Sequence, residues 1–408
     1  MHIKYWVVMA LIKIDEPEKS DKQNQGFSNH PVWRLGFRPF YLLATSFAAI
    51  SIPLWLASYS GWFQAAPNVN LLWHMHEMVF GFAIAVIIGF LYTAGRNWTG
   101  LWTPRGGQLA TLSALWLAGR LSMLATPTVL TALIDWVFIP LATWPIYQVL
   151  KRAGNKRNMF LVGLLSLLTL ENTLFHAASF GWLEISPIVV MQGAILVIVI
   201  ITSVIGGRVI PGFTANAIPG LKTIVEPKRD KITIALTVAA SVAWLLPLPA
   251  AIIGSLAISA AIMQIIRLAG WQPQRTLQRP LLWILHISYG WMPLGFILLG
   301  LAEWEVLPSS AAFHALAVGT ISGLIVGMIT RTALGHTGRQ LKAGRPELCM
   351  YMLIQIGALA RLIAAITIGS TREFMLAIAA LSWSATFLLY LTVYGPYLLR
   401  LRLDGKEG

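Results

Sequence analysis

Two histidines and a carboxylate, His74, His76 and Glu77, open a long apolar run that continues to about Ala94. The run is long enough to cross a lipid bilayer, which takes roughly 20 helical residues. Imidazole is the commonest metal ligand in proteins, and a neighbouring carboxylate can hold or pass on a proton. Ionisable groups at membrane depth usually mark a site, although histidine and tryptophan also anchor helices at the interface. We therefore expect a functional site at the start of this run.

Six of the eight histidines lie in or beside apolar runs: His74, His76, His176, His286, His314 and His336. Cys349 is the single cysteine, so this sequence can form neither an internal disulfide nor a cysteine cage around a metal. A tightly held redox metal would therefore depend on histidine, assisted by methionine, glutamate or tyrosine. His74 and His76 point about 200° apart on an ideal helix, so they face different partners if both are helical.

The composition identifies the class of protein. The chain of 408 residues is 57% hydrophobic and 11% charged, and its mean hydropathy is +0.69. With its long apolar runs, it is typical of a polytopic membrane protein and unlike a soluble globular domain. The formal net charge is +14, but the basic residues lie in short segments between the apolar runs. We interpret them as topology signals and expect no nucleic-acid surface.

The apolar runs predict an all-α fold, a polytopic transmembrane helix bundle of about twelve spans. Pro247 and Pro249 predict a tight turn between the seventh and eighth spans. The expected spans cover residues 40–59, 72–94, 108–124, 129–150, 158–180, 186–205, 231–248, from that turn to 268, 280–302, 309–331, 348–368 and 373–399.

Positive charge falls in alternate segments between these spans, with Arg372 as the exception. Cytoplasmic loops carry an excess of lysine and arginine, so the alternation predicts an even number of spans and cytoplasmic termini. We expect residues 1–30 to form a flexible N-terminal segment and residues 31–408 to form a single transmembrane helical domain. The lipid bilayer is therefore an expected partner.

This topology places four histidines in one outer layer of the bundle: His74, His76, His176 and His314. Facing helices often build metal sites inside bundles, so we predict that the four share a metal site. The alternative for each one is a hydrogen-bonded core or interfacial histidine. His286 and His336 fall near the inner side. We expect them to lie too far away to join the outer layer, because the hydrocarbon core is about 30 Å thick.

Charged side chains inside the expected spans need partners. Arg120 and Asp135 both lie in the outer half and could pair, because a membrane arginine commonly pairs with a carboxylate. Glu171 and Arg361 lie deeper. Glu171 could handle protons, and a structural ion pair is the alternative.

Small residues recur at four-residue spacing below two of the outer histidines. The positions are Gly81, Ala85 and Gly89 in one run and Gly319, Gly323 and Gly327 in the other. This spacing allows another helix to approach closely. It could equally allow a flat macrocycle to lie against the backbone.

Short motifs spread over nearly the whole chain from residue 31 resemble those of the NnrS family. The matching segments are 36–40, 73–82, 97–100, 206–216 and 330–339, together with His314. Gly212 departs from the bulkier residue expected there. The resemblance implies a twelve-helix protein of the bacterial inner (cytoplasmic) membrane that contains copper and haem of the b type. It also implies a link to nitric oxide metabolism, denitrification and resistance to nitrosative stress.

Under this resemblance, the four outer histidines would bind haem iron and copper, and Glu77 and Glu171 would be the catalytic proton carriers. His286 and His336 would bind a second, inner haem or line a site for quinol or protons. Guanidinium groups suit haem propionates, which are carboxylates. The cofactor-binding arginines would be Arg120, Arg331 and Arg361.

Three functions remain open at this stage. The first is a haem–copper redox protein that acts on nitric oxide and could reduce it with electrons from quinol or another donor. The second is a membrane transporter or a metal- or haem-handling protein without redox turnover, which would show helices broken at mid-depth. The third is a nitric oxide sensor or sink.

Overall fold

The computed structural model describes residues 29–63 and 68–407, and every regular element within these ranges is helical. The expected flexible N-terminal segment falls almost wholly outside them. The first half contains α1 (Phe37–Tyr59), α2 (Leu71–His76), the π-helical η3 (Glu77–Ala83), α3 (Ile84–Thr99), α4 (Gly107–Ser122), α5 (Val129–Trp136), α6 (Phe138–Arg152), α7 (Phe160–Ser179) and α8 (Pro187–Ala217). The second half contains α9 (Pro227–Trp244), α10 (Ala250–Gly270), α11 (Pro280–Glu303), α12 (Ser309–His314), the π-helical η6 (Ala315–Ser322), α13 (Gly323–His336), α14 (Arg345–Ile366) and α15 (Gly369–Leu399).

Ten helices in the described part of the chain are long and apolar enough to cross a membrane, so the protein has the character of a multi-pass membrane protein. Two of the twelve expected spans coincide with helices outside these ten. The expected third span is α4, which has 16 residues, fewer than the roughly 20 that a bilayer requires. The expected seventh span is α9, whose first turn carries Lys228, Arg229, Asp230 and Lys231.

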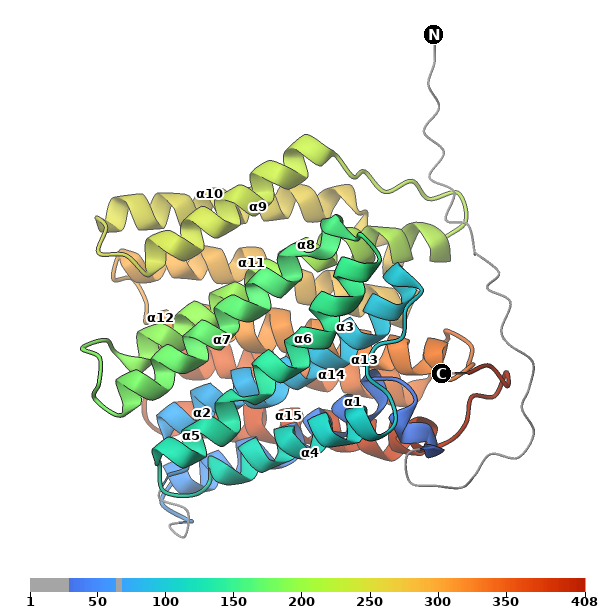
Figure 1. Ribbon diagram of the computed structural model, residues 1–408. Helices are drawn as coiled ribbons and strands as arrows, with labels where there is room; N and C mark the ends of the chain where they lie inside the picture. The colour runs from blue at the N-terminus through green and yellow to red at the C-terminus, as the bar shows by residue number, and fades with distance from the viewer. Residues whose placement is uncertain (1–28, 64–67, 408) are drawn as a thin grey trace.

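The two most buried of the ten membrane-length helices are Leu71–Thr99 and Ser309–His336. Each of them is a short α-helix, a π-helical segment and a longer α-helix in unbroken succession. Figure 1 shows α3 and α13 in the middle of the bundle, with α9 and α10 along its upper edge and α4 along its lower edge. The helices that carry His74, His76 and His314 are therefore central, where charged groups are shielded from lipid.

The glycine runs on these two helices serve helix packing. A Cβ at Gly89 would lie 3.0 Å from the Cβ of Phe40 in α1, and one at Gly327 would lie 2.7 Å from Leu285 Cδ2 in α11. A Cβ at Gly323 would collide with Ser288, also in α11. Small residues thus let α1 and α11 approach the central helices closely. Neighbouring helices occupy the space beside these three glycines, so no macrocycle can lie there.

A buried arginine links the start of the first long helix to the end of the last one. Nη1 of Arg38 in α1 donates to the carbonyls of Leu398 and Arg400 at 2.9 and 2.7 Å. Charge-assisted bonds of this kind satisfy the last carbonyls of α15, which have no partner within their own helix. The start of α1 and the end of α15 therefore lie at the same face of the bundle.

Candidate functional site

The helix ends that carry histidines lie together at one end of the bundle. α2 ends at His76 and α12 ends at His314, and both short helices lie at the left of Figure 1. Each runs directly into a π-helical segment, η3 after α2 and η6 after α12. Single π turns inside α-helices are frequent at functional sites. The two histidine-bearing segments therefore share one local construction.

Side chains satisfy backbone carbonyls that the π turns leave available. Nε1 of Trp116 in α4 donates to the Gly81 carbonyl in η3 at 3.0 Å. Oγ of Ser322 donates to the Ala317 carbonyl in η6 at 2.8 Å. An unsatisfied buried carbonyl costs about 1–3 kcal/mol. These two bonds therefore stabilise the irregular backbone that follows the histidines.

His74 and His76 face different sides of α2, as their spacing predicts. The His74 ring stacks on Trp55 of α1, with the ring centroids 4.2 Å apart. The His76 ring packs against Phe175 of α7, with the centroids 4.7 Å apart. The four outer histidines consequently divide into two pairs with different surroundings: His76 with His176, and His74 with His314.

Five ionisable side chains meet beside α2, and we call them the charged cluster: His76, Glu77, Arg120, Asp135 and His176. Arg120 bridges the two carboxylates, since Nη1 donates to Glu77 Oε1 at 2.7 Å and Nη2 donates to Asp135 Oδ1. His76 Nδ1 lies 2.9 Å from Glu77 Oε1, and His176 Nε2 lies 3.0 Å from Asp135 Oδ2. All five side chains are buried or nearly so. The expected pairing of Arg120 with Asp135 is confirmed.

Both ring nitrogens of His76 face oxygen atoms. Nδ1 faces Glu77, while Nε2 lies 3.0 Å from Asn172 Oδ1 and 3.3 Å from Asp135 Oδ2. With both histidines neutral, two carboxylates and one guanidinium leave the charged cluster with one unbalanced negative charge. A buried unbalanced charge is costly. One proton on a histidine would neutralise it, and a metal cation would also offset it.

The charged cluster also has the donor atoms of a metal site. His76, Asp135 and His176 each offer one ligand atom, and these atoms all lie within 4.8 Å of one another. Two imidazoles and a carboxylate suit copper, zinc or iron. The negative charge of the cluster favours a cation for the same reason that it favours a proton. The residues present therefore fit a transition-metal ion.

His74 and His314 line a second site, a cavity of about 450 Å³ that we call the outer pocket. Cofactor and small-molecule sites typically enclose about 300–1,000 Å³. Most of the lining is apolar and includes Trp55, Phe82 and Trp383. The outer pocket is thus large enough for a sizeable apolar ligand and offers imidazole groups to it.

The two imidazoles of the outer pocket differ in how their nitrogens are held. His314 Nδ1 donates to the Ser310 carbonyl at 2.6 Å, which leaves Nε2 as the unprotonated nitrogen. Histidines that bind metals usually have their other nitrogen held in this way. His74 Nδ1 is buried and makes no hydrogen bond. An orphaned buried nitrogen costs free energy unless a ligand pairs with it.

Two arginines line the same pocket, Arg361 of α14 and Arg372 of α15. Neither takes part in an ion pair within the described residues. Arg361 is half-buried and Arg372 is exposed, so they line the deeper wall and the rim. Guanidinium groups bind carboxylates and phosphates through paired hydrogen bonds. The outer pocket therefore suits an apolar ligand that carries anionic groups.

The second predicted catalytic carboxylate lies apart from both sites. Glu171 of α7 is half-buried beside Gly193 of α8, where an added Cβ would lie 3.0 Å from its Oε1. Glu171 belongs neither to the charged cluster nor to the lining of the outer pocket. Its neighbour Asn172 is the residue that reaches the charged cluster, with its Nδ2 2.9 Å from Asp135 Oδ2.

The predicted inner residues also lie outside the outer pocket. His286 is buried, with Nε2 2.9 Å from Thr214 Oγ1 and with Nδ1 unpartnered. His336 is half-buried, and its ring centroid lies 5.7 Å from that of Phe37. The Arg331 guanidinium lies 4.0 Å above an aromatic ring of α8. None of the three lines the outer pocket.

Sequence reasoning missed two members of these sites. Asp135 appears there as a partner of Arg120, but it also contacts both histidines of the charged cluster. Arg372 appears only as the exception to the alternating charge pattern. That exception is the signal that could have found it, because a basic residue in a segment expected to carry no positive charge needs a local reason.

One comparison with known proteins identifies the family. The family model described as NnrS protein matches residues 31–402, which include the charged cluster and the outer pocket. No curated protein matches the chain.

Proposed function

We propose that this chain, which belongs to the NnrS family, is a haem- and copper-containing redox protein of the bacterial inner membrane. It would act in nitric oxide metabolism or in resistance to nitrosative stress. The outer pocket carries the proposal, because one cavity combines two histidines, an apolar lining and two arginines that lack ion-pair partners within the described residues.

The residues of the outer pocket fit a haem of the b type. His314 would offer its Nε2 to the iron and leave the opposite position open, His74 would lie on the wall of the same pocket, and Arg361 and Arg372 would pair with the two propionates. When bound, haem would supply an iron centre able to bind nitric oxide. The apolar lining would exclude water, which favours an uncharged diatomic ligand over water at that centre.

The residues of the charged cluster fit copper. His76, Asp135 and His176 would hold the ion, while Arg120 limits the negative charge around it. Reduction of nitric oxide would consume protons as well as electrons. Glu77 contacts His76 and Arg120, and its Oε2 has no hydrogen-bond partner. Glu77 is therefore the carboxylate of the cluster best placed to take up and release a proton.

The proposed topology has twelve spans with both termini in the cytoplasm, α4 and α9 completing the ten membrane-length helices. Alternating loop charge supports it, and the contact of Arg38 with the end of α15 is consistent with termini on one side. His286 and His336 would then lie on the cytoplasmic side, as ligands of a second haem or beside a quinol site. A reporter fused after Arg402 should be active in the cytoplasm, and periplasmic activity would refute this topology.

The two other functions make different demands on the structure. A transporter would have helices broken at mid-depth, whereas Leu71–Thr99 and Ser309–His336 run on through their π-helical segments. A nitric oxide sensor or sink would use the same pocket and the same ligands without turnover. The absorption spectrum of bound haem therefore distinguishes the redox protein from a transporter. The rate of nitric oxide turnover distinguishes it from a sensor or sink.

The test uses the purified full-length protein. We expect a haem absorption band that shifts when nitric oxide is added, together with stoichiometric copper. His314→Ala should lose haem while keeping copper, and His176→Ala should lose copper while keeping haem. His30→Ala, at an exposed histidine away from both sites, is the matched control. Wild-type protein free of both haem and copper would refute the proposal, and nitric oxide binding without reduction would identify a sensor or sink.

A further inference from the structure

A second cavity lies next to the outer pocket, toward the middle of the bundle, and we call it the apolar chamber. Its volume is about 110 Å³. Its walls come from α1, α3, α8, α11, η6 and α13, and they are aliphatic or aromatic apart from Thr202 and the hydroxyl of Tyr41. Dry apolar cavities of about 150 Å³ bind xenon or benzene, whereas a stable water needs two to four polar partners.

The apolar chamber and the outer pocket lie end to end, because three helices pass from one to the other within about a turn. Ile198 of α8 and Ile321 of η6 line both cavities. On the third helix Phe82 lines the outer pocket and Val86 lines the chamber, four residues or roughly 6 Å further along.

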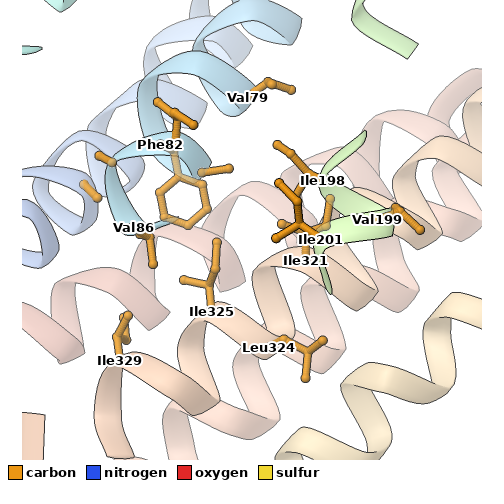
Figure 2. Close-up of a cluster of buried hydrophobic side chains, with 14 of the residues drawn as sticks. Val79, Phe82, Val86, Ile198, Val199, Ile201, Ile321, Leu324, Ile325 and Ile329 are labelled. Carbon is orange, nitrogen blue, oxygen red and sulfur yellow. The ribbon is translucent and has the colours of Figure 1, made fainter. Parts of the chain in front are cut away.

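Figure 2 shows how these walls meet. The Ile198 and Ile201 side chains extend from α8 toward Ile321, while Phe82 and Val86 approach from the opposite helix. Ile198 is 1% exposed and Ile321 is 7% exposed. Apolar side chains that can change rotamer therefore lie between the two cavities at this point.

Four of the residues that line the apolar chamber are not fully buried. Ile87 and Phe90 of α3, Ile205 of α8 and Met328 of α13 line the chamber and are half-buried. These side chains belong to membrane-length helices, so a chamber that opens past them would open into the hydrocarbon of the bilayer. Small uncharged gases dissolve more readily in hydrocarbon than in water.

From this arrangement we infer that the apolar chamber binds a small uncharged diatomic gas and passes it from the bilayer to the outer pocket. The inference rests on the proposed function only in its last step, where the gas meets the ligand-binding centre of the outer pocket. The gas would enter past Met328 and Phe90 and leave past Ile198 and Ile321. A charged or strongly hydrated substrate would find no polar group to replace its water along this route.

Xenon tests the chamber without requiring any cofactor. Xenon-pressurised crystals of the full-length protein, or xenon NMR in micelles, should show an atom bound between α3, α8 and α13. Ile325, 8% exposed, lines the chamber, so Ile325→Trp should abolish xenon binding and Ile325→Ala should strengthen it. Ile265→Trp, at a position on α10 that is 47% exposed, is the matched control and should bind xenon like the wild type. Circular dichroism checks that each variant folds.

Gas recombination tests the route. After flash photolysis of carbon monoxide from the protein with its cofactors, Ile325→Trp should slow recombination by about tenfold, a barrier increase of ~1.4 kcal/mol. Ile265→Trp should leave the rate unchanged. A missing xenon site, or recombination that is equal in all variants, would overturn the inference while leaving the proposed function intact. If the protein holds no haem, the proposed function fails and the xenon result alone decides whether the chamber binds a gas.

Discussion

The rings of His76 and His176, on α2 and α7, lie with their centroids 5.4 Å apart. Both rings reach Oδ2 of Asp135, at 3.3 and 3.0 Å. One carboxylate on a third helix therefore holds both histidines, and it also bonds the only guanidinium of the charged cluster. A change at Asp135 must disturb all of these contacts together.

Asp135→Asn should destabilise the folded protein by about 3–5 kcal/mol, because it leaves the Arg120 charge with less compensation in a buried site. It should also lower the copper content, since the amide is a poorer metal ligand than the carboxylate. Thermal unfolding in detergent and metal analysis measure the two effects. Glu184→Gln, in the exposed segment between α7 and α8, is the control and should change neither quantity. Unaltered stability in Asp135→Asn would mean that the cluster contributes little to folding.

Arg361→Gln and Arg372→Gln should each weaken haem retention by about tenfold. A hydrogen bond to a charged group contributes about 1.5–3 kcal/mol, and partial exposure lowers that value at Arg372. The measurement is haem transfer to an apo-globin acceptor, followed by absorbance. Arg275→Gln, at an exposed arginine between α10 and α11, should lose haem at the wild-type rate. Equal rates in all four proteins would separate these arginines from cofactor binding.

Gly89→Ala should lower the free energy of unfolding by about 1–3 kcal/mol. Its new Cβ would meet Phe40 Cβ at 3.0 Å and the Gly36 carbonyl oxygen at 3.3 Å, so the neighbouring backbone must shift. Gly163→Ala supplies the contrast, because nothing lies within 4 Å of a Cβ there. Alanine forms helix better than glycine by up to about 1 kcal/mol, so this control should be neutral or stabilising. A loss of stability in chemical unfolding for Gly89→Ala, with none for Gly163→Ala, would confirm close helix packing at Gly89.

His286→Ala and His336→Ala should show whether an inner site exists. His286 has one buried nitrogen without a hydrogen-bond partner, so the His286→Ala variant should lose haem if that nitrogen binds iron. Retained haem with lost turnover in either variant would instead indicate a role in quinol or proton access. Haem quantitation by pyridine haemochrome and a nitric oxide electrode provide the two readouts. Full haem and full turnover in both variants would exclude an inner site.

The sequence predicts correctly what depends on helix period and on the cost of buried charge. His74 and His76 contact different neighbours because two positions that are two residues apart lie on nearly opposite sides of a helix with 3.6 residues per turn. The pairing of Arg120 with Asp135 follows from the expense of leaving either charge alone in an apolar bundle. These predictions use only local geometry and electrostatics, so a single sequence is sufficient for them.

The sequence does not reveal which outer histidines meet. His176 and His314 are isolated in their helices, and the rotation of α7 and α12 about their own axes depends on packing against other helices. The same limit applies to Arg372, since its place at the outer pocket depends on how α15 lies against α14 and α1. The sequence also does not reveal where each span ends. The apolar run around 108–124 extends beyond α4, which ends at Ser122.

The direction in which the histidine side chains point depends on the number of residues in the π-helical segments η3 and η6. A π turn bonds residue i to residue i+5, so it takes one more residue than an α turn. Deleting one residue from η3 would let the helix close as α and would rotate His74 and His76 by about 100° relative to Gly89. The longer helices that follow the π-helical segments, α3 and α13, would keep their packing against the neighbouring helices. Single-residue insertions and deletions at these two places would thus give evolution a way to re-orient the site without repacking the bundle.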